Sequence, residues 1–158
     1  MLPLIRTDSS HQDFQDLVRL LDADLHLRDG EDHVFYAQFN KIDSIQHVVV
    51  AYVSNQAVGC GAFKPYADRV VEIKRMFVRP EFRNQRIAQK VLQELEAWAD
   101  EIGMTGCVLE TGQKQPEAIR LYQRNGYELI PNYGQYAGVE NSVCMQKNIA
   151  KKADHFCC

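Results

Sequence analysis

The stretch "VRPEFRNQRIAQKVL", residues 78–92, changes from a strand-like pattern to an amphipathic helix within a few residues. Two arginines and two amide side chains, residues 83–86, stand directly before the apolar face of that helix. A helix start exposes unpaired backbone N–H groups and carries partial positive charge, so more cations there are unfavourable unless an anion binds among them. The stretch therefore predicts an anion-binding loop between a strand and a helix. A solvated loop that only caps the helix would explain the same residues.

Three strand-like runs precede this loop. "HVVVAYV", residues 47–53, and "AVGCGAFK", residues 57–64, are rich in β-branched and small apolar residues. Ser54-Asn55-Gln56 between them is typical of a hairpin connection, because Asn tolerates a positive φ. "RVVEIKRMFV", residues 69–78, is a third strand, longer and more polar than the first two.

Helices and strands alternate after the loop. The predicted helix keeps one apolar face for about four turns and ends at Gly103, a common helix terminator. That face consists of Ile87, Val91, Leu95, Trp98, Ala99 and Ile102. Four further elements are expected: a buried strand, a helix with a proline in its first turn, another strand and an edge strand, over residues 106–111, 116–125, 127–130 and 142–149.

The N-terminal part of the chain predicts helix. Ser9 and Ser10 are helix-start residues, and apolar side chains recur behind them at steps of three and four. These side chains are Phe14, Leu17, Val18, Leu21 and Leu25. "HVFYAQFN", residues 33–40, indicates a second helix or a structured loop. A hairpin followed by alternating helices and strands predicts an α/β (α+β) fold, with a mixed, mostly antiparallel central sheet and helices on both faces.

Length and composition set limits on the class of protein. A chain of 158 residues suits one domain, here residues 1–150, followed by a flexible tail at 151–158. The formal net charge of −3 gives no basic surface for nucleic acid. No apolar run reaches the roughly 20 residues that cross a bilayer, and the N-terminus lacks a signal-peptide pattern. We therefore expect a cytoplasmic protein with no nucleic-acid or membrane partner.

The five cysteines are an odd number, and without a secretion signal they indicate reduced thiols. Cys60, Cys107 and Cys144 lie in strand-like segments without an adjacent histidine, which predicts buried apolar side chains. Cys157 and Cys158 end the chain without a lipidation motif, and with His155 they make an incomplete metal site. No metal is expected.

Two segments together resemble the GNAT superfamily of N-acetyltransferases, over roughly residues 45–148. In the family's acetyl-CoA loop, Gln/Arg-x-x-Gly-x-Gly/Ala, Arg83 takes the first position and Ala88 the last, while Arg86 stands where the middle Gly usually is. "AIRLYQRNGYE", residues 118–128, looks like the family's Ala-x-x-Leu-Tyr-x-x-x-Gly-Phe signature, with Tyr127 in place of Phe. "LET", residues 109–111, fits the strand end between them. The resemblance implies a GNAT-like domain with splayed strands around acetyl-CoA.

Acetyl-CoA as co-substrate is what the resemblance implies. Backbone N–H groups of residues 84–88 would hold the pyrophosphate, and Arg83 would add charge-assisted bonds. Arg86 must point outward or toward a phosphate, or the loop binds more weakly. The pantetheine arm would pair with the third strand as an added strand does. Gln115 stands where many members have an Asn that contacts the cofactor. The implied binding residues are Met76, Phe77, Val78, Arg83, Asn84, Gln85, Arg86, Ile87, Ala88, Gln115 and Tyr122.

Two residues are candidates for the chemistry. Glu72 is the candidate base, because it lies on the strand that resembles the family's cofactor strand, where some members carry a catalytic Glu. If side chains alternate, Glu72, Lys74 and Met76 share one face, and a solvent-facing Glu-Lys pair is the competing interpretation. Tyr122 matches the family's Tyr and is the candidate acid for the leaving thiolate, with a core Tyr as the alternative.

The loop "PNYGQYAGVENS", residues 131–142, is the candidate acceptor region. In proteins of this family the corresponding loop helps to shape the acceptor cleft, so Tyr133, Tyr136 and Glu140 would bind the substrate together with Glu72. A Gly-rich connection with packed tyrosines explains the same residues.

The hypothesis is an acetyl-CoA-dependent N-acetyltransferase that acts on a primary amine of a small molecule by direct attack in a ternary complex. The alternatives are acetylation of a peptide or protein, and an acyl-CoA-binding module that has lost its chemistry. A nucleotide-binding domain is disfavoured because no Gly-x-x-x-x-Gly-Lys-Ser/Thr loop is present. Family members commonly pair through their sheets, which allows a homodimer, although no residue pattern here requires one.

Overall fold

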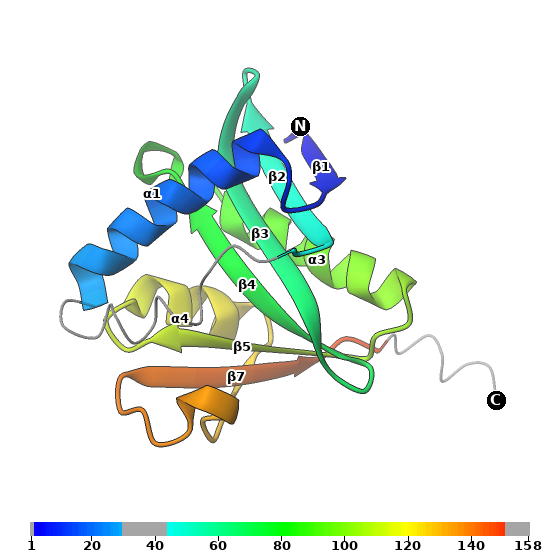
Figure 1. Ribbon diagram of the computed structural model, residues 1–158, viewed down its shortest axis with the longest axis vertical. Helices are drawn as coiled ribbons and strands as arrows, with labels where there is room; N and C mark the ends of the chain where they lie inside the picture. Colours follow the sequence, from blue (N-terminus) through cyan, green and yellow to red (C-terminus); the bar gives the residue numbers. More distant parts are fainter. Residues whose placement is uncertain (1, 30–43, 151–158) are drawn as a thin grey trace.

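The computed structural model describes residues 2–29 and 44–150 (Figure 1). Two sequence-based predictions, the helix or loop at 33–40 and the tail at 151–158, lie outside the described residues, and so do Cys157 and Cys158.

One mixed sheet of seven strands forms the centre of the described structure, in the order β1-β2-β3-β4-β5-β7-β6. Every neighbouring pair is antiparallel except β4 and β5, which are parallel. This confirms the mixed, mostly antiparallel sheet. The strands are β1 Leu4–Thr7, β2 His47–Val53, β3 Gln56–Ala67, β4 Val70–Val78, β5 Gly106–Gly112, β6 Glu128–Ile130 and β7 Ser142–Asn148.

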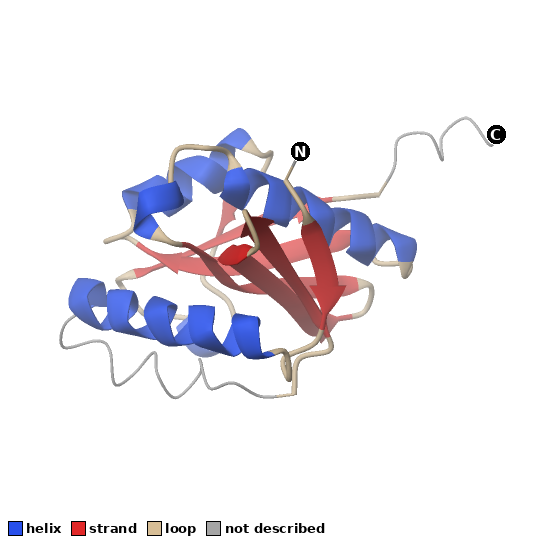
Figure 2. Cartoon of the chain, turned by 90° about the horizontal axis from the view of Figure 1, so that it is seen from above, coloured by secondary structure: helices blue, strands red, loops and turns tan. Residues whose placement is uncertain are grey.

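Helices cover both faces of this sheet, as expected (Figure 2). Helix α1, Gln12–Asp29, packs Phe14, Leu17 and Val18 on one face. Helix α3, Ile87–Glu101, packs on the opposite face, and α4, Pro116–Arg124, contributes to the same apolar cluster as α3. Two single-turn 3-10 helices, η2 Pro80–Phe82 and η3 Gly134–Tyr136, lie in the connections. No helix among the described residues is both long and apolar enough to span a bilayer.

Helix α1 begins later than its sequence predicted. Ser9 does not cap it, because the Ser9 hydroxyl accepts a hydrogen bond from the backbone N–H of Ile45 at 2.9 Å. Ser10 donates its own N–H to the Asp8 carboxylate at 2.9 Å, which closes a turn before Gln12. Ser9 therefore ties the helix entry to the chain before β2, whereas Ser10 closes the local turn.

Two strand predictions need correction. β1 was not recognised, because its four residues carry too short a pattern, yet it pairs antiparallel with β2 along its whole length. The strand at residues 142–149 was expected at the edge of the sheet, but β7 lies between β5 and β6, so the short β6 is the edge. The exposed side chain of Leu129 lies on that edge strand.

Helix α3 buries nearly the face that its sequence predicted. The prediction that Ile102 belongs to this face is wrong, since Ile102 follows the helix and is 42% exposed. Leu92, which the predicted face did not include, is fully buried. Gly103 adopts φ 92° directly after the helix end, where a left-handed residue was expected. Ser54 and Asn55 both adopt positive φ between β2 and β3, which confirms the hairpin turn.

Strand β4 contains a bulge that changes which side chains share a face. Cys60 pairs with Phe77 and Ala62 with Lys74, so only Gly61 lies opposite Arg75 and Met76. A Cβ atom at Gly61 would lie within 3 Å of the Met76, Leu95 and Val91 side chains, so any larger residue would force them to shift. The prediction that Met76 shares a face with Glu72 and Lys74 is therefore wrong: Met76 packs with the α3 cluster.

Candidate active site

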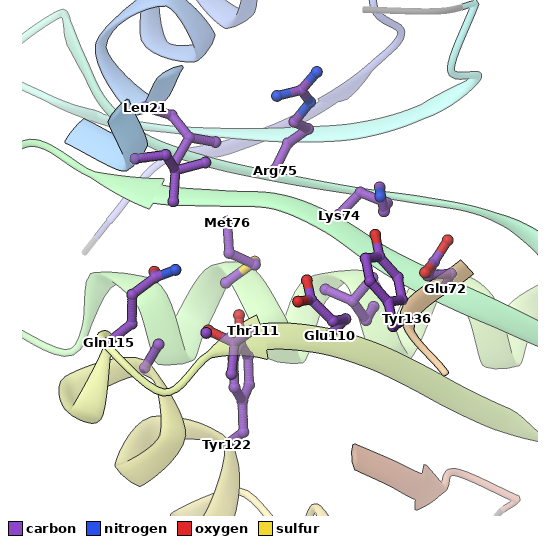
Figure 3. Close-up of a pocket in the computed structure, with 14 residues that line it drawn as sticks. Leu21, Glu72, Lys74, Arg75, Met76, Glu110, Thr111, Gln115, Tyr122 and Tyr136 are labelled. Atoms are coloured by element: carbon purple, nitrogen blue, oxygen red, sulfur yellow. The ribbon is translucent and has the colours of Figure 1, made fainter. Parts of the chain in front are cut away.

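The candidate site begins where the parallel strands β4 and β5 separate. Their pairing ends at Glu72 and Val108, so no described strand pairs with residues 73–78 of β4 on the β5 side. A cavity opens at this separation, and side chains from both strands, α1, α4 and η3 line it (Figure 3). Splayed strands were expected from the family resemblance, and the pairing register confirms them.

The loop before α3 presents backbone donors. Asn84 and Arg86 adopt positive φ, 65° and 64°, and no side chain caps the helix start. The backbone N–H of Lys90 bonds to the Arg86 carbonyl at 3.1 Å, so the N–H groups of the first helical turn point out of the helix. The sequence left open whether Arg86 points outward or toward a phosphate. Its side chain is exposed, which agrees with the outward direction. This loop fits a phosphate group, because its N–H groups and helix dipole favour an anion.

Arg83 has a different environment from Arg86. Its Nε donates to the Val78 carbonyl at 2.9 Å, its Nη2 lies 3.8 Å from the Asp24 carboxylate, and its guanidinium faces the Phe77 ring at 5.6 Å. Arg83 therefore lies at the end of β4 and joins the loop to the strand and to α1. Asn84 and Gln85 are exposed, Ile87 is buried and Ala88 is half-buried.

Ion pairs hold α1 against α4 beside the cavity. Arg28 lies 3.3 Å from Asp24 of its own helix and also pairs with Glu117 in the first turn of α4. Because α1 is held in this position, Leu21 and Leu25 form one wall of the cavity. Sequence reasoning did not find this connection, since its two helices are far apart along the chain.

Tyr122 lies on the cavity wall and is also part of the core. Its ring makes an edge contact with Tyr127, with the centroids 5.8 Å apart, and only 6% of the residue is exposed. Burial, reinforced by the negative charge of Glu110, raises the pKa of the Tyr122 phenol, so the hydroxyl keeps its proton at neutral pH. The side chain of Gln115, at the start of α4, lines the same cavity.

Glu72 is buried, at 3% exposure, which contradicts the interpretation of a solvent-facing Glu-Lys pair. The Tyr133 hydroxyl donates to its Oε2 at 2.7 Å. Burial and then the Glu72 charge raise the pKa of Tyr133, so this phenol remains a donor. The structure thus brings together Glu72 and one residue of the predicted acceptor loop.

The other acceptor-loop residues separate in the structure. Tyr136 is buried and lines the cavity, with its ring 5.8 Å from that of Tyr133. Glu140 is exposed and does not line the cavity; its backbone carbonyl accepts a bond from Gln113. Sequence reasoning missed Glu110, which lines the cavity and accepts a hydrogen bond from the Ser142 hydroxyl at 2.8 Å. The sequence did contain a sign of this role, because Glu110 is a charged residue in "LET", within a short strand that was predicted to be buried.

The three described cysteines are buried, as expected. Burial raises the pKa of Cys60 and of Cys107 to about 12. Cys60 donates to the Arg75 carbonyl at 3.4 Å, and none of the three thiols lines the cavity. Within the described ranges, no group of three or more His, Cys, Asp or Glu residues is placed to hold a metal ion.

The parallel strands β4 and β5 separate beside the uncapped start of α3, and a buried tyrosine and a buried glutamate line the opening. This arrangement is that of an acetyltransferase fold. The chain belongs to the acetyltransferase (GNAT) family, whose model matches residues 14–127. This match confirms the resemblance to the GNAT superfamily.

Comparisons with individual proteins agree with this family. The IAA acetyltransferase of Azospirillum brasilense is 35% identical over 100 residues, which are 63% of this chain and 65% of that relative, just under two thirds of its length. The uncharacterised N-acetyltransferase YsnE of Bacillus subtilis is 31% identical over 63% of this chain and 67% of its own.

Solved structures extend the likeness to most of the chain. A Klebsiella pneumoniae protein described as an acyl-CoA N-acyltransferase superposes with a TM-score of 0.79 and 27% identity, over 94% of this chain and 98% of its own. The PaiA N-acetyltransferase of Thermoplasma acidophilum, solved in complex with coenzyme A, gives a TM-score of 0.70 over 94% and 99% of the two chains. At 16% identity, this second likeness shows the fold alone.

Proposed function

We propose that this protein is an acetyl-CoA-dependent N-acetyltransferase that acetylates a primary amine of a small molecule by direct attack in a ternary complex. The observation that carries the proposal is the cavity between β4 and β5, lined by both Glu72 and Tyr122. Membership in the acetyltransferase (GNAT) family supports the reaction class. The cavity has walls from two strands, two helices and η3, which favours a small acceptor over a protein surface.

The residues around the opening fit the co-substrate. Acetyl-CoA supplies an activated acetyl group as a thioester. Among the described residues, the edge of β4 that faces β5 has no strand partner at residues 73–78 and can pair with the amides of an extended arm. The uncapped N–H groups at the start of α3 can bind a pyrophosphate, and Arg83 supplies a cation beside them.

Glu72 and Tyr122 take complementary roles in the transfer. Glu72, oriented by the Tyr133 hydroxyl, accepts a proton from the acceptor ammonium, directly or through one water. The amine nitrogen then forms a bond to the acyl carbon, the carbon–sulfur bond breaks, and the second proton that the nitrogen loses on becoming an amide passes to the departing thiolate or to water. Tyr122 donates a hydrogen bond to the sulfur as negative charge develops there. The pKa of an ordinary phenol, about 10, already lies above that of an ordinary thiol, about 8.5. Burial raises the pKa of Tyr122 further, so stabilisation of the thiolate is favoured over complete proton transfer.

The buried cysteines support direct attack over an acetyl-cysteine intermediate. A nucleophilic cysteine must be a thiolate near the substrate. Cys60 and Cys107 have pKa values raised to about 12 by burial, and Cys144 has a pKa raised by the same cause. None of the three lines the cavity, which favours the amine itself as the nucleophile.

Thermal unfolding with and without acetyl-CoA, followed by a free-thiol assay against a panel of amines, tests the proposal. A ligand at a hundred times its Kd stabilises the native state by about 2.7 kcal/mol, which for a chain of this size raises Tm by roughly 5–10 °C. A shift together with amine-dependent thiol release supports the transferase. A shift without release from any amine favours a binding module, and no shift at all would overturn the assignment of the loop.

A further inference from the structure

The two halves of α1 are held to the protein in different ways. In the first half, Phe14 and Leu17 are fully buried in the apolar cluster under the helix. Burial decreases beyond Leu21, since Leu25 is only partly buried and Leu27 is 82% exposed. Ion pairs therefore supply much of what holds the second half of α1, the half that brings Leu25 to the cavity wall.

Asp24 is the acidic residue that two arginines share in this half. Its Oδ2 lies 3.3 Å from Nε of Arg28, one turn later in α1, and 3.8 Å from Nη2 of Arg83, in the loop before α3. Arg28 also pairs with Glu117 in the first turn of α4, which lies beside the end of α1 (Figure 1). The four side chains alternate in sign and connect the anion-binding loop, α1 and α4 around the opening.

Arg83 does not need Asp24 for its placement. Its Nε donates to the Val78 carbonyl at 2.9 Å, and its guanidinium faces the Phe77 ring at 5.6 Å. These two contacts hold the side chain over the end of β4. The distance of 3.8 Å to the Asp24 carboxylate is longer than a hydrogen bond. Asp24 therefore neutralises part of the Arg83 charge without orienting the guanidinium.

Asp24 and a phosphate at the loop would act on the same cation. A pyrophosphate on the N–H groups of residues 84–88 brings negative charge close to Arg83, where the Asp24 carboxylate repels it. The side chains of Asp24 and Arg83 are 31% and 32% exposed, so their ion pair is weak enough for a phosphate to replace it. Arg28 is then the partner that remains for Asp24, on the same helix and at the shorter distance.

We propose that Asp24 is a positioning residue that passes from one arginine to another when the co-substrate binds. Without a phosphate, Asp24 is shared by Arg83 and Arg28; when a pyrophosphate pairs with Arg83, Asp24 pairs with Arg28 alone. The stronger pair orients the guanidinium that contacts Glu117, and so fixes the second half of α1 against α4. The inference rests on the proposed function, since the phosphate is that of acetyl-CoA.

Asp24→Asn tests the competition, because it keeps the shape of the side chain and removes its charge. We expect the Kd of coenzyme A in calorimetry to fall about three- to fivefold, while the loss of ion pairs lowers the stability of the ligand-free protein. A residue with only a structural role would weaken both stability and binding. Opposite changes in the two quantities are therefore the signature of the competition.

Asp16→Asn is the matched control. It removes the same charge from α1, but Asp16 pairs with Arg19 and lies about 12 Å from Asp24 along the helix. That separation exceeds the screening length of about 8 Å at physiological ionic strength. An unchanged or higher Kd in Asp24→Asn, or an equal fall in Asp16→Asn, would overturn the competition and leave the proposed function standing. If the wild type binds no coenzyme A, both proposals fail.

Arg28→Met tests whether Arg28 acts through Asp24. The substitution removes the competing cation and keeps an apolar stem of similar length, so Asp24 is left to Arg83. We expect the Kd of coenzyme A to rise about threefold in the wild-type background and to stay unchanged in the Asp24→Asn background. An equal rise in both backgrounds would show that Arg28 attracts the co-substrate directly, and would refute the exchange of partners.

Amide hydrogen exchange measures the effect on the cavity wall without any turnover. Saturating coenzyme A should slow exchange at residues 22–28 of α1 more in the wild type than in Asp24→Asn, since only the wild type has a carboxylate to pass to Arg28. Protection by direct contact with the ligand is common to both proteins, so the difference between them reports the exchange of partners. Equal slowing in both proteins, or none in either, would contradict the fixed wall.

Discussion

The backbone at Arg86 stores strain that a single substitution releases. Arg86 precedes α3 with φ 64° and ψ 17°, where a residue with a Cβ atom pays about 1–2 kcal/mol. Glycine removes this cost, but it lowers the stability of the native state by about 0.5–1 kcal/mol because the unfolded chain gains conformational freedom. Both Arg86→Gly and Arg86→Ala also remove an exposed cation from a helix start. The difference between the two variants is therefore the Cβ strain minus the entropic penalty of glycine, about 0.5–1 kcal/mol in favour of glycine.

Urea unfolding followed by circular dichroism measures this difference. We expect Arg86→Gly to have the higher midpoint with an unchanged slope, and a Tm about 1–4 °C above that of Arg86→Ala. Since both variants lose the same charge, any difference in acetyl-CoA affinity reports the backbone of the loop. If Arg86→Ala proves as stable as Arg86→Gly, the Cβ strain does not exceed the entropic penalty of glycine, and the predicted difference is refuted.

Four further outcomes are expected. Tyr122→Phe lowers kcat about a hundredfold at unchanged acetyl-CoA affinity, because only the donor to sulfur is lost; an unchanged kcat contradicts this role. Glu72→Gln lowers the rate most at low pH in a pH-rate profile, and equal turnover at every pH would assign the base elsewhere. Arg83→Glu severely weakens acetyl-CoA binding in calorimetry, since it places a carboxylate beside Asp24 and the Val78 carbonyl; unchanged affinity would refute the loop assignment. Burial lowers the pKa of His47, so the unfolded chain binds the proton more tightly and stability falls as the pH drops below about 6.5; His47→Phe should flatten that dependence in unfolding measured from pH 7 to 5.

Local patterns in the sequence were sufficient for most of the fold. The hairpin at Ser54 and Asn55, the apolar face of α3 and the stop at Gly103 each depend on residues close together in the chain. The family was also recognisable, because residues 83–88 and 118–128 carry the motifs in continuous segments. β1 and the internal position of β7 were missed, since strand order depends on pairing partners far away in sequence.

The candidate site was only partly visible in the sequence. Glu72 and Tyr122 were identified from the motif positions, and both line the cavity. Alternation failed at Met76, because a bulge opposite Gly61 adds one residue to β4 and reverses the faces beyond it. Arg75 and Glu110 looked like ordinary strand residues until packing showed that both line the cavity.

The sequence by itself determined the elements, the family and the chemistry available, because hydrophobic periodicity, turn residues and motifs act over short distances along the chain. Only the tertiary structure decided which charges are desolvated and which donors are left without acceptors. Tyr133 donates to Glu72, 61 positions away in the sequence, and Arg75 Nη1 donates to Asp22, 53 positions away. The buried Arg75 Nη2 has no hydrogen-bond partner among the described residues. Burial and long-range contacts of this kind arise when the strands and helices assemble, so no local pattern could reveal them.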